Sequence, residues 1–197
     1  MTVRSEHLGG RLPLAGPASF NPAQQAFYDS VMSNQWPWAQ HAGFAITAAD
    51  GRLIGPFNAF LLHPEVASRF LAFSAAESTH TTLSQRVREV VILAVGGVWG
   101  ACYELYAHAV LAADAGIAPE AIRALAAGEV PAPLTGEEAI AARIAHELST
   151  RHDVDDELFG EGLRTFGRQG LFDIAALMGQ YATVSILLTL FKVPAPE

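Results

Sequence analysis

Uncharged, mostly apolar residues gather in the middle of the chain, between acidic groups. The fourteen residues from Val90 to Tyr103 carry no charge, with Glu89 before them and Glu104 and His108 after them. A stretch of this kind belongs in a protein core. The groups at its edges are therefore expected to be drawn at least partly out of water, where a polar group needs a partner. Buried acids and bases with partners often mark functional sites.

Helix signals dominate the rest of the pattern, and strand signals are scarce. Capping side chains, prolines at helix starts and glycines at helix ends predict helices over residues 23–33, 65–77, 84–95, 99–115, 119–127, 139–150, 155–166 and 172–191. The chain is therefore predicted to be all-α, with about eight helices. Thr135 has capping-box spacing ahead of residue 139. Around Gly96 to Gly100, either a hairpin of two helices or one kinked helix fits the pattern.

One short region is the only candidate for extended structure. It covers residues 44–55, where Ala49-Asp50-Gly51 resembles a turn. No alternating run of useful length flanks this turn, so a sheet is not predicted.

Length and charge narrow the possible classes of protein. The 197 residues are 51% hydrophobic, which is enough for one ordinary globular domain over 1–197; two small domains are a weaker alternative. Acidic residues outnumber basic ones by 20 to 12, for a net charge of -8, and no block of Lys or Arg occurs. This balance argues against nucleic acid or an anionic membrane as a partner.

The sequence gives no support for an export signal and only weak support for a membrane-spanning segment. The first ten residues lack the apolar core of a signal peptide, so a cytoplasmic location is expected. The uncharged run from Ile174 to Phe191 reaches the lower edge of the length needed to span a membrane. Because polar residues such as Gln180 and Ser185 interrupt it, a buried helix is the preferred interpretation.

Cys102 is the single cysteine, which excludes an internal disulfide and a metal site of several thiolates.

Glu104 and His108 form the clearest candidate site. They are four residues apart, so on one helix they share a face and their side chains can meet. A carboxylate raises the basicity of a neighbouring imidazole and fixes its tautomer, which is the usual arrangement of a general base near neutral pH. Glu89 lies nineteen residues before His108. A reversal at Gly96 to Gly100 would bring it alongside.

Each of these residues also has an ordinary structural interpretation. Glu-His pairs at this spacing are common on solvated helix faces, and Glu89 could instead bridge to Arg86 or Arg88. Free cysteine is often a small buried hydrophobe, as Cys102 would be in a core. Two aromatic side chains close to the pair, Trp99 and Tyr103, are as well suited to core or subunit contacts as to substrate binding.

Two motifs together resemble a known family. Leu83-Ser-Gln-Arg-Val-Arg, Glu89, and then Glu104-Leu-Tyr-Ala-His108 resemble the carboxymuconolactone decarboxylase family, which includes alkylhydroperoxidase D. The likeness is densest over residues 56–128 and looser over a helical C-terminal extension at 135–192. It implies an alkylhydroperoxidase D-like helical bundle with a central helical hairpin that carries the site. It also implies a homo-oligomer (dimer, trimer or hexamer). Residues 174–191 are expected to pack at a subunit interface.

Cysteines separate the branches of this family. The peroxidase branch has Cys-x-x-Cys-x-x-x-His, and counting back from His108 places Ala101 and Glu104 at the two cysteine positions. Cys102 is one residue away from the first of them. A dithiol peroxidase closes a disulfide after its nucleophile is oxidised, and this chain cannot do so internally. Glu104-Leu-x-x-His108 instead resembles the thiol-free, decarboxylase-type branch, whose members need no metal and no organic cofactor.

The resemblance leads to one mechanistic hypothesis and two alternatives. His108, oriented by Glu104 and Glu89, is expected to shuttle a proton in a lyase or isomerase reaction of a small oxygenated carboxylic acid or lactone. Candidate substrate-binding residues are Arg86 (or Arg88), Trp99, Tyr103 and Tyr181, and the Trp36-Pro37-Trp38 patch either lines the pocket or packs. A thiol-dependent peroxidase that uses Cys102 is the first alternative. A non-catalytic, oligomeric ligand-binding protein is the second.

Overall fold

A computed structural model describes residues 7–132, 134 and 136–196 of the chain, and this part is all-α, as predicted. Thr135, the predicted capping residue, lies outside the described residues. The described helices are α1 (Pro22–Ala42), α2 (Pro56–Phe60), α3 (Pro64–His80), α4 (Gln85–Trp99), α5 (Cys102–Asp114), α6 (Pro119–Ala126), α7 (Gly136–Thr150) and α8 (Asp156–Phe191), with a short 3-10 helix at Pro17–Ser19.

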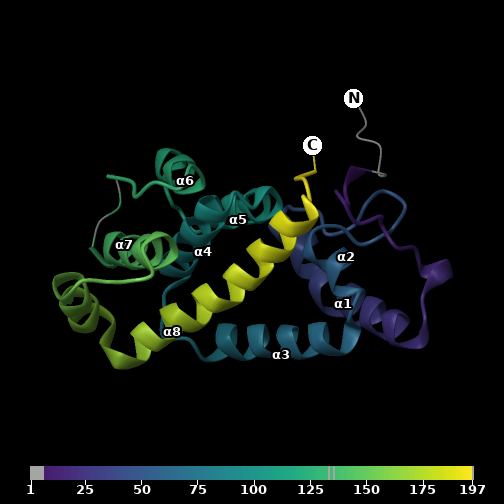
Figure 1. The fold of residues 1–197 in the computed structure, drawn as a ribbon, viewed down its shortest axis with the longest axis horizontal. Helices are drawn as coiled ribbons and strands as arrows, with labels where there is room; N and C mark the ends of the chain where they lie inside the picture. The colour runs from purple at the N-terminus through teal and green to yellow at the C-terminus, as the bar shows by residue number, and fades with distance from the viewer. Residues whose placement is uncertain (1–6, 133, 135, 197) are drawn as a thin grey trace.

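The long helix α8 crosses the molecule diagonally, with α4, α6 and α7 toward one end and α1 and α2 toward the other (Figure 1). Two clusters of buried apolar side chains correspond to these ends. Both α5 and α8 contribute to each cluster: Ala107 and Val184 belong to the first, and Ala112 and Leu177 to the second. The residues of α5 and α8 that lie between these positions are therefore placed where the two clusters meet.

The central segment forms a hairpin of two helices rather than one kinked helix. The first of them, α4, continues through Gly96 and Gly97 to Trp99, and Gly100 ends it in the left-handed conformation, with φ 62°. A Cβ on Gly97 would lie 2.0 Å from the carbonyl oxygen of Leu125, so glycine is needed there for the close approach of the chain after α6. Gly97 thus serves packing, and α4 passes through both glycines without a break.

Helix α1 is longer than predicted. It runs to Ala42 rather than ending near residue 33, and Pro37 lies inside it. Buried Val31 and Ala39 lie before and after the proline, so packing of this face continues past it. This tertiary packing outweighs the missing backbone hydrogen bond.

Residues 44–55 form an irregular turn instead of a sheet. Ala48 and Ile54 donate backbone hydrogen bonds to Arg52 and Ile46, at 2.8 and 2.9 Å, and Thr47 and Leu53 make an isolated antiparallel bridge. Ile46, Leu53 and Ile54 are buried, which fixes the turn to the core. The predicted turn at residues 49–51 is therefore present.

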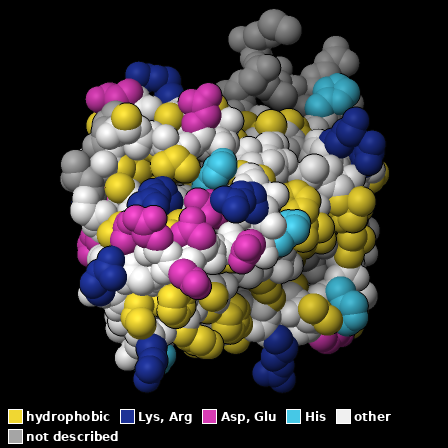
Figure 2. Space-filling view, turned by 60° about the vertical axis from the view of Figure 1, so that its left-hand side comes forward, with side chains coloured by type: hydrophobic (Ala, Val, Ile, Leu, Met, Phe, Trp, Pro, Cys, Tyr) yellow, Lys and Arg dark blue, Asp and Glu magenta, His cyan; other side chains and the backbone are white. Residues whose placement is uncertain are grey.

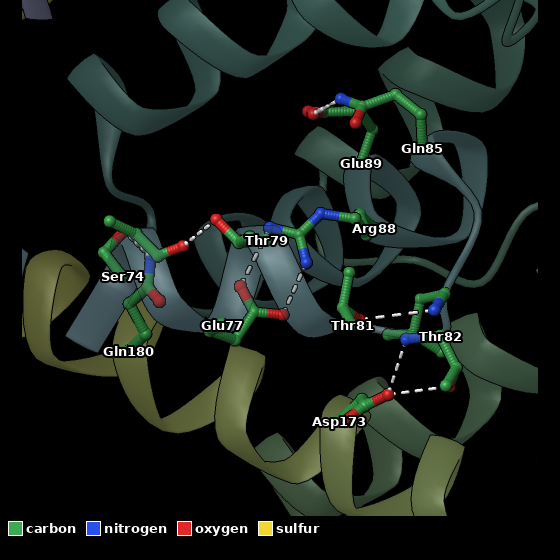
Figure 3. A network of polar contacts seen from close by, with 12 residues as sticks. Ser74, Glu77, Thr79, Thr81, Thr82, Gln85, Arg88, Glu89, Asp173 and Gln180 are labelled. Carbon is green, nitrogen blue, oxygen red and sulfur yellow. Dashed lines mark hydrogen bonds and ion pairs between the residues drawn. The ribbon is translucent and has the colours of Figure 1, made fainter. Parts of the chain in front are cut away.

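The last two predicted helices are joined in α8. Gly167, with φ 65° and ψ -178°, breaks the helical geometry without a connecting loop. By length and composition, α8 is the one described helix that could cross a membrane, which is weak evidence because buried helices of soluble proteins pass the same test. Asp173 accepts hydrogen bonds from the backbone N–H and the hydroxyl of Thr82, at 2.8 and 2.7 Å (Figure 3). These bonds tie α8 to the start of α4, as expected for a core helix.

Charged groups on the surface over the α7 end of the molecule are mixed in sign. Figure 2 shows acidic and basic side chains side by side on this face. Two ion pairs of this end are Arg86 with Glu138 and Arg143 with Glu161. This face has no broad region of one charge.

Candidate active site

The α4–α5 hairpin places two carboxylates on opposite sides of one imidazole. His108 Nδ1 lies 2.7 Å from Glu89 Oε2, and His108 Nε2 lies 3.3 Å from Glu104 Oε1. All three residues are buried, with exposures of 2 to 6%. The reversal at Gly100 brings Glu89 to His108, and the four-residue spacing on α5 brings Glu104 to it.

A further residue fixes the orientation of Glu89. The side-chain amide of Gln85 donates a 2.6 Å hydrogen bond to Glu89 Oε1, so both carboxylate oxygens of Glu89 have a partner (Figure 3). Gln85 stands one turn before Glu89 on α4. This spacing was visible in the sequence, but Gln85 was not singled out there.

The environment of His108 favours its protonated form. Burial lowers the pKa of an imidazole, but the charge of Glu89 and hydrogen bonds to Glu104 and Glu89 outweigh this effect and raise the pKa of His108 to about 10. Near neutral pH the ring is then an imidazolium with a proton on each nitrogen. His108 is therefore suited to donate a proton, which is one of the two directions of the proton shuttle that the sequence suggested.

Tyr181 of α8 closes the site from the other side. Its ring meets that of His108 edge to face, with centroids 5.0 Å apart. Burial, together with the charges of Glu104 and Glu89, raises the pKa of Tyr181 well above its ordinary value. Its phenol therefore keeps its proton and can serve as a neutral hydrogen-bond donor.

Two neighbouring pockets share His108 and Tyr181 in their walls and form the two lobes of the candidate site. The first, the aromatic lobe, has a volume of about 130 Å³, and Glu104 lines it. Its apolar wall includes Phe44, Phe57, Phe60, Phe70, Tyr103 and Val184. The second, the polar lobe, has a volume of about 340 Å³. Its polar wall includes Asn34, Ser74, Ser78, Gln85, Arg88 and Glu89.

Some residues line both lobes, and they come from distant parts of the chain. Gln35 and Trp38 of α1 join His108 and Tyr181 in this group. Trp38 also packs edge to face on Phe44, with centroids 5.0 Å apart. Of the Trp36-Pro37-Trp38 patch, Trp38 is thus a cavity residue. Gln35 had no distinguishing spacing in the sequence.

Comparison with known proteins agrees with the motifs. Residues 64–147, which include Gln85, Glu89, Glu104 and His108, match the Carboxymuconolactone decarboxylase family. This segment, less than half of the chain, is similar to that family. No curated protein matches the chain significantly.

A solved structure extends the likeness of fold beyond the family segment. It is the crystal structure of an uncharacterized peroxidase-related protein from Silicibacter sp. TM1040. The two chains are 17% identical and superpose with a TM-score of 0.70, over 100% of this chain and 95% of the other. At this identity the likeness establishes the fold and not the activity. It confirms the expected alkylhydroperoxidase D-like helical bundle.

Cys102 stands apart from the cavity. It is exposed at the first position of α5, with its Sγ 3.7 Å from the carbonyl oxygen of Gly100. It lines neither lobe. The structure therefore does not bring Cys102 together with the cavity wall that carries Glu89, Glu104 and His108.

The four candidate substrate-binding residues divide into two groups. Tyr103 and Tyr181 line the cavity, and the Tyr103 hydroxyl donates a 2.6 Å hydrogen bond to the carbonyl oxygen of Ala45. Arg86 and Trp99 line neither lobe. Arg86 pairs with Glu138, which raises the pKa of its guanidinium, and Trp99 is 41% exposed at the end of α4.

Arg88, the alternative to Arg86, does reach the polar lobe. Its two terminal nitrogens are hydrogen-bonded to the two carboxylate oxygens of Glu77 (Figure 3). Both side chains are almost completely buried, at 10 and 4% exposure. Among the described residues, no group of three or more His, Cys, Asp or Glu is arranged to hold a metal ion.

Proposed function

We propose that the protein is a lyase or isomerase that needs no metal or organic cofactor and acts by Glu/His acid-base catalysis. Its substrate would be a small oxygenated carboxylic acid or lactone. The observation that supports this proposal is the buried imidazolium of His108, held between Glu89 and Glu104 in the wall of a cavity. The likeness of residues 64–147 to the family and the expected cytoplasmic location are compatible with metabolism of small molecules.

The two ring nitrogens of His108 would have different tasks. The Nδ1 proton is held by Glu89 at 2.7 Å, and Gln85 supports Glu89. The contact of Nε2 with Glu104 is longer, at 3.3 Å, and Glu104 lines the aromatic lobe. The Nε2 proton is thus the one available to a bound substrate.

In a decarboxylation, the bond to the carboxylate carbon breaks and its electron pair passes into an adjacent carbonyl group. The resulting enolate then takes the Nε2 proton of His108 at carbon, and neutral His108 regains a proton from water. In an isomerisation, Glu104 would accept a proton from one carbon while His108 donates to another atom. In both cases the imidazolium stabilises negative charge where it develops.

The test begins with turnover of a panel of lactones and keto acids, followed by release of carbon dioxide and by absorbance. Cys102→Ser is expected to leave any such turnover unchanged, within about twofold, because Cys102 is exposed and lines neither lobe. Loss of that turnover in the serine variant would contradict the acid-base proposal.

The second candidate function is a thiol-dependent peroxidase, which the exposure of Cys102 favours. One equivalent of hydrogen peroxide or an organic peroxide, with the thiol followed by intact mass, separates the two. An inert thiol is the expected result. Rapid formation of sulfenic acid or a mixed disulfide would support the peroxidase instead.

We also propose that the protein forms a homo-oligomer, as the family resemblance implies. Large apolar side chains of α8 remain exposed in the single chain: Phe172 at 71%, Leu190 at 56% and Ile186 at 45%. Burial of such groups between copies would be favourable. Light scattering is expected to give a mass above 21.0 kDa, the mass of one chain. A monomer would contradict this expectation.

A further inference from the structure

Each cation that lines the cavity already has a carboxylate partner. Arg88 is the one Lys or Arg among the described residues that lines either lobe, and both its terminal nitrogens are engaged by Glu77. Figure 3 shows the guanidinium of Arg88 directed at this carboxylate. The imidazolium of His108 is likewise held by Glu89 and Glu104. Two cations thus face three carboxylates.

A carboxylate entering this site would add to an existing excess of negative charge. The groups concerned are buried, so water screens their repulsion poorly. The new anion would also lose its hydration without gaining an unpaired cation in return. A neutral molecule avoids both penalties.

The remaining groups of the cavity suit neutral oxygen atoms and an apolar body. Around the polar lobe, the amides of Asn34, Gln35 and Gln85 and the hydroxyls of Ser74 and Ser78 offer uncharged hydrogen-bonding groups. The aromatic lobe offers phenylalanine rings, among them Phe57 and Phe60. The two kinds of surface meet at His108 and Tyr181, both of which carry a donor.

We propose that the cavity selects an uncharged amphiphilic molecule, such as a lactone with a hydrocarbon chain, over the corresponding carboxylate. The chain lies in the aromatic lobe, and the ester oxygens lie at His108 and toward the polar lobe. Gln35, which lines both lobes, is a specificity-determining residue at their junction. This inference rests on the proposed function and narrows it to isomerisation of a lactone, because a substrate without a free carboxylate cannot lose carbon dioxide.

The test is binding of two probes with one carbon skeleton, γ-nonalactone and the anion 4-hydroxynonanoate. Calorimetric titration of the full chain at pH 7 is expected to give at least tenfold tighter binding of the lactone. Equal binding, tighter binding of the anion, or no binding of either probe would overturn the inference. Since no turnover is measured, this result is independent of the variants that test the chemistry.

Variants of α1 test the location and the charge argument separately. Gln35→Leu is expected to weaken lactone binding about three- to tenfold, by loss of one hydrogen-bonding group. Gln40→Leu is the matched control, because Gln40 lies on α1 but lines neither lobe. Equal effects of the two variants would place the lactone elsewhere and overturn the assignment.

Asn34→Lys adds a cation at the polar lobe from an exposed helical position. It is expected to tighten binding of 4-hydroxynonanoate severalfold and to leave the lactone unchanged, whereas the neutral control Asn34→Gln should change neither. If the added cation does not improve binding of the anion, lack of positive charge is not the basis of selection. That result would overturn the inference.

Discussion

Replacing His108 with glutamine (His108→Gln) is expected to lower turnover of a substrate found in the panel by about 10²- to 10⁴-fold, the usual contribution of a positioned proton donor. Glutamine keeps polar groups in the cavity wall but cannot deliver the Nε2 proton. The substitution His63→Gln is the matched control, since this histidine is 70% exposed and pairs with the equally exposed Glu65. Turnover that survives in the His108 variant would contradict the role of His108 as proton donor.

The pH dependence of the same reaction gives a second expected result. If protonated His108 is the donor, turnover should persist through neutral pH and fall as pH rises through about 10, the pKa of His108. Glu89→Gln removes the charge that supports the imidazolium, so the fall should move to lower pH. A pH profile that is identical in wild type and in Glu89→Gln would exclude this role for the pair.

The raised pKa of His108 also affects stability. A histidine whose folded pKa lies above its unfolded value of 6.5 contributes stability that is fully present below that value. This contribution is lost as pH rises toward about 10, because the unfolded chain has by then released the proton that the folded chain still holds. The free energy of unfolding of the wild type should therefore decline over this range more than that of His108→Gln.

The largest expected effect on stability is that of Glu77→Ala. It would leave the guanidinium of Arg88 buried without its counter-charge, since the two side chains are only 4 and 10% exposed. Removal of one partner of such a buried pair costs about 3–5 kcal/mol. Urea denaturation should show this loss. The exposed pair of His63 and Glu65 provides the control, because Glu65→Ala should cost less than about 1 kcal/mol.

A double substitution tests the reason for that loss. Glu77→Met combined with Arg88→Met removes both charges and fills the space with apolar groups. Most of the lost stability should return, since replacement of a whole buried ion pair is often neutral or favourable. A double variant as unstable as Glu77→Ala would show that packing, and not the unpaired charge, causes the effect.

The sequence was sufficient to predict the helical fold and the central hairpin, because helix starts, helix ends and apolar runs are local signals. It also identified Glu89, Glu104 and His108 as candidates, through their spacing and their position beside a core segment. The contact of Glu89 with His108 required only one reversal, which Gly100 provides.

Other features depend on packing between distant segments, which spacing alone does not reveal. Gln35 and Trp38 reach the cavity only because α1 continues through Pro37. Likewise, the sequence did not pair Arg88 with Glu77, and hence could not show that its charge is already compensated. The sequence suggested both Glu104 and Glu89 as partners of His108, but their combined effect on its pKa depends on distances that only the fold fixes.

The walls of the cavity come partly from the segment that matches the family and partly from residues outside it. Gln85, Glu89, Glu104 and His108 all lie within the family segment at 64–147. By contrast, Gln35, Trp38 and Tyr181 lie outside it and face the same space. The proposed proton donor and the residues proposed to select the ligand can therefore change separately during evolution. Under the proposal, a relative that kept the hairpin but exchanged its first and last helices would retain the same acid and accept a different molecule.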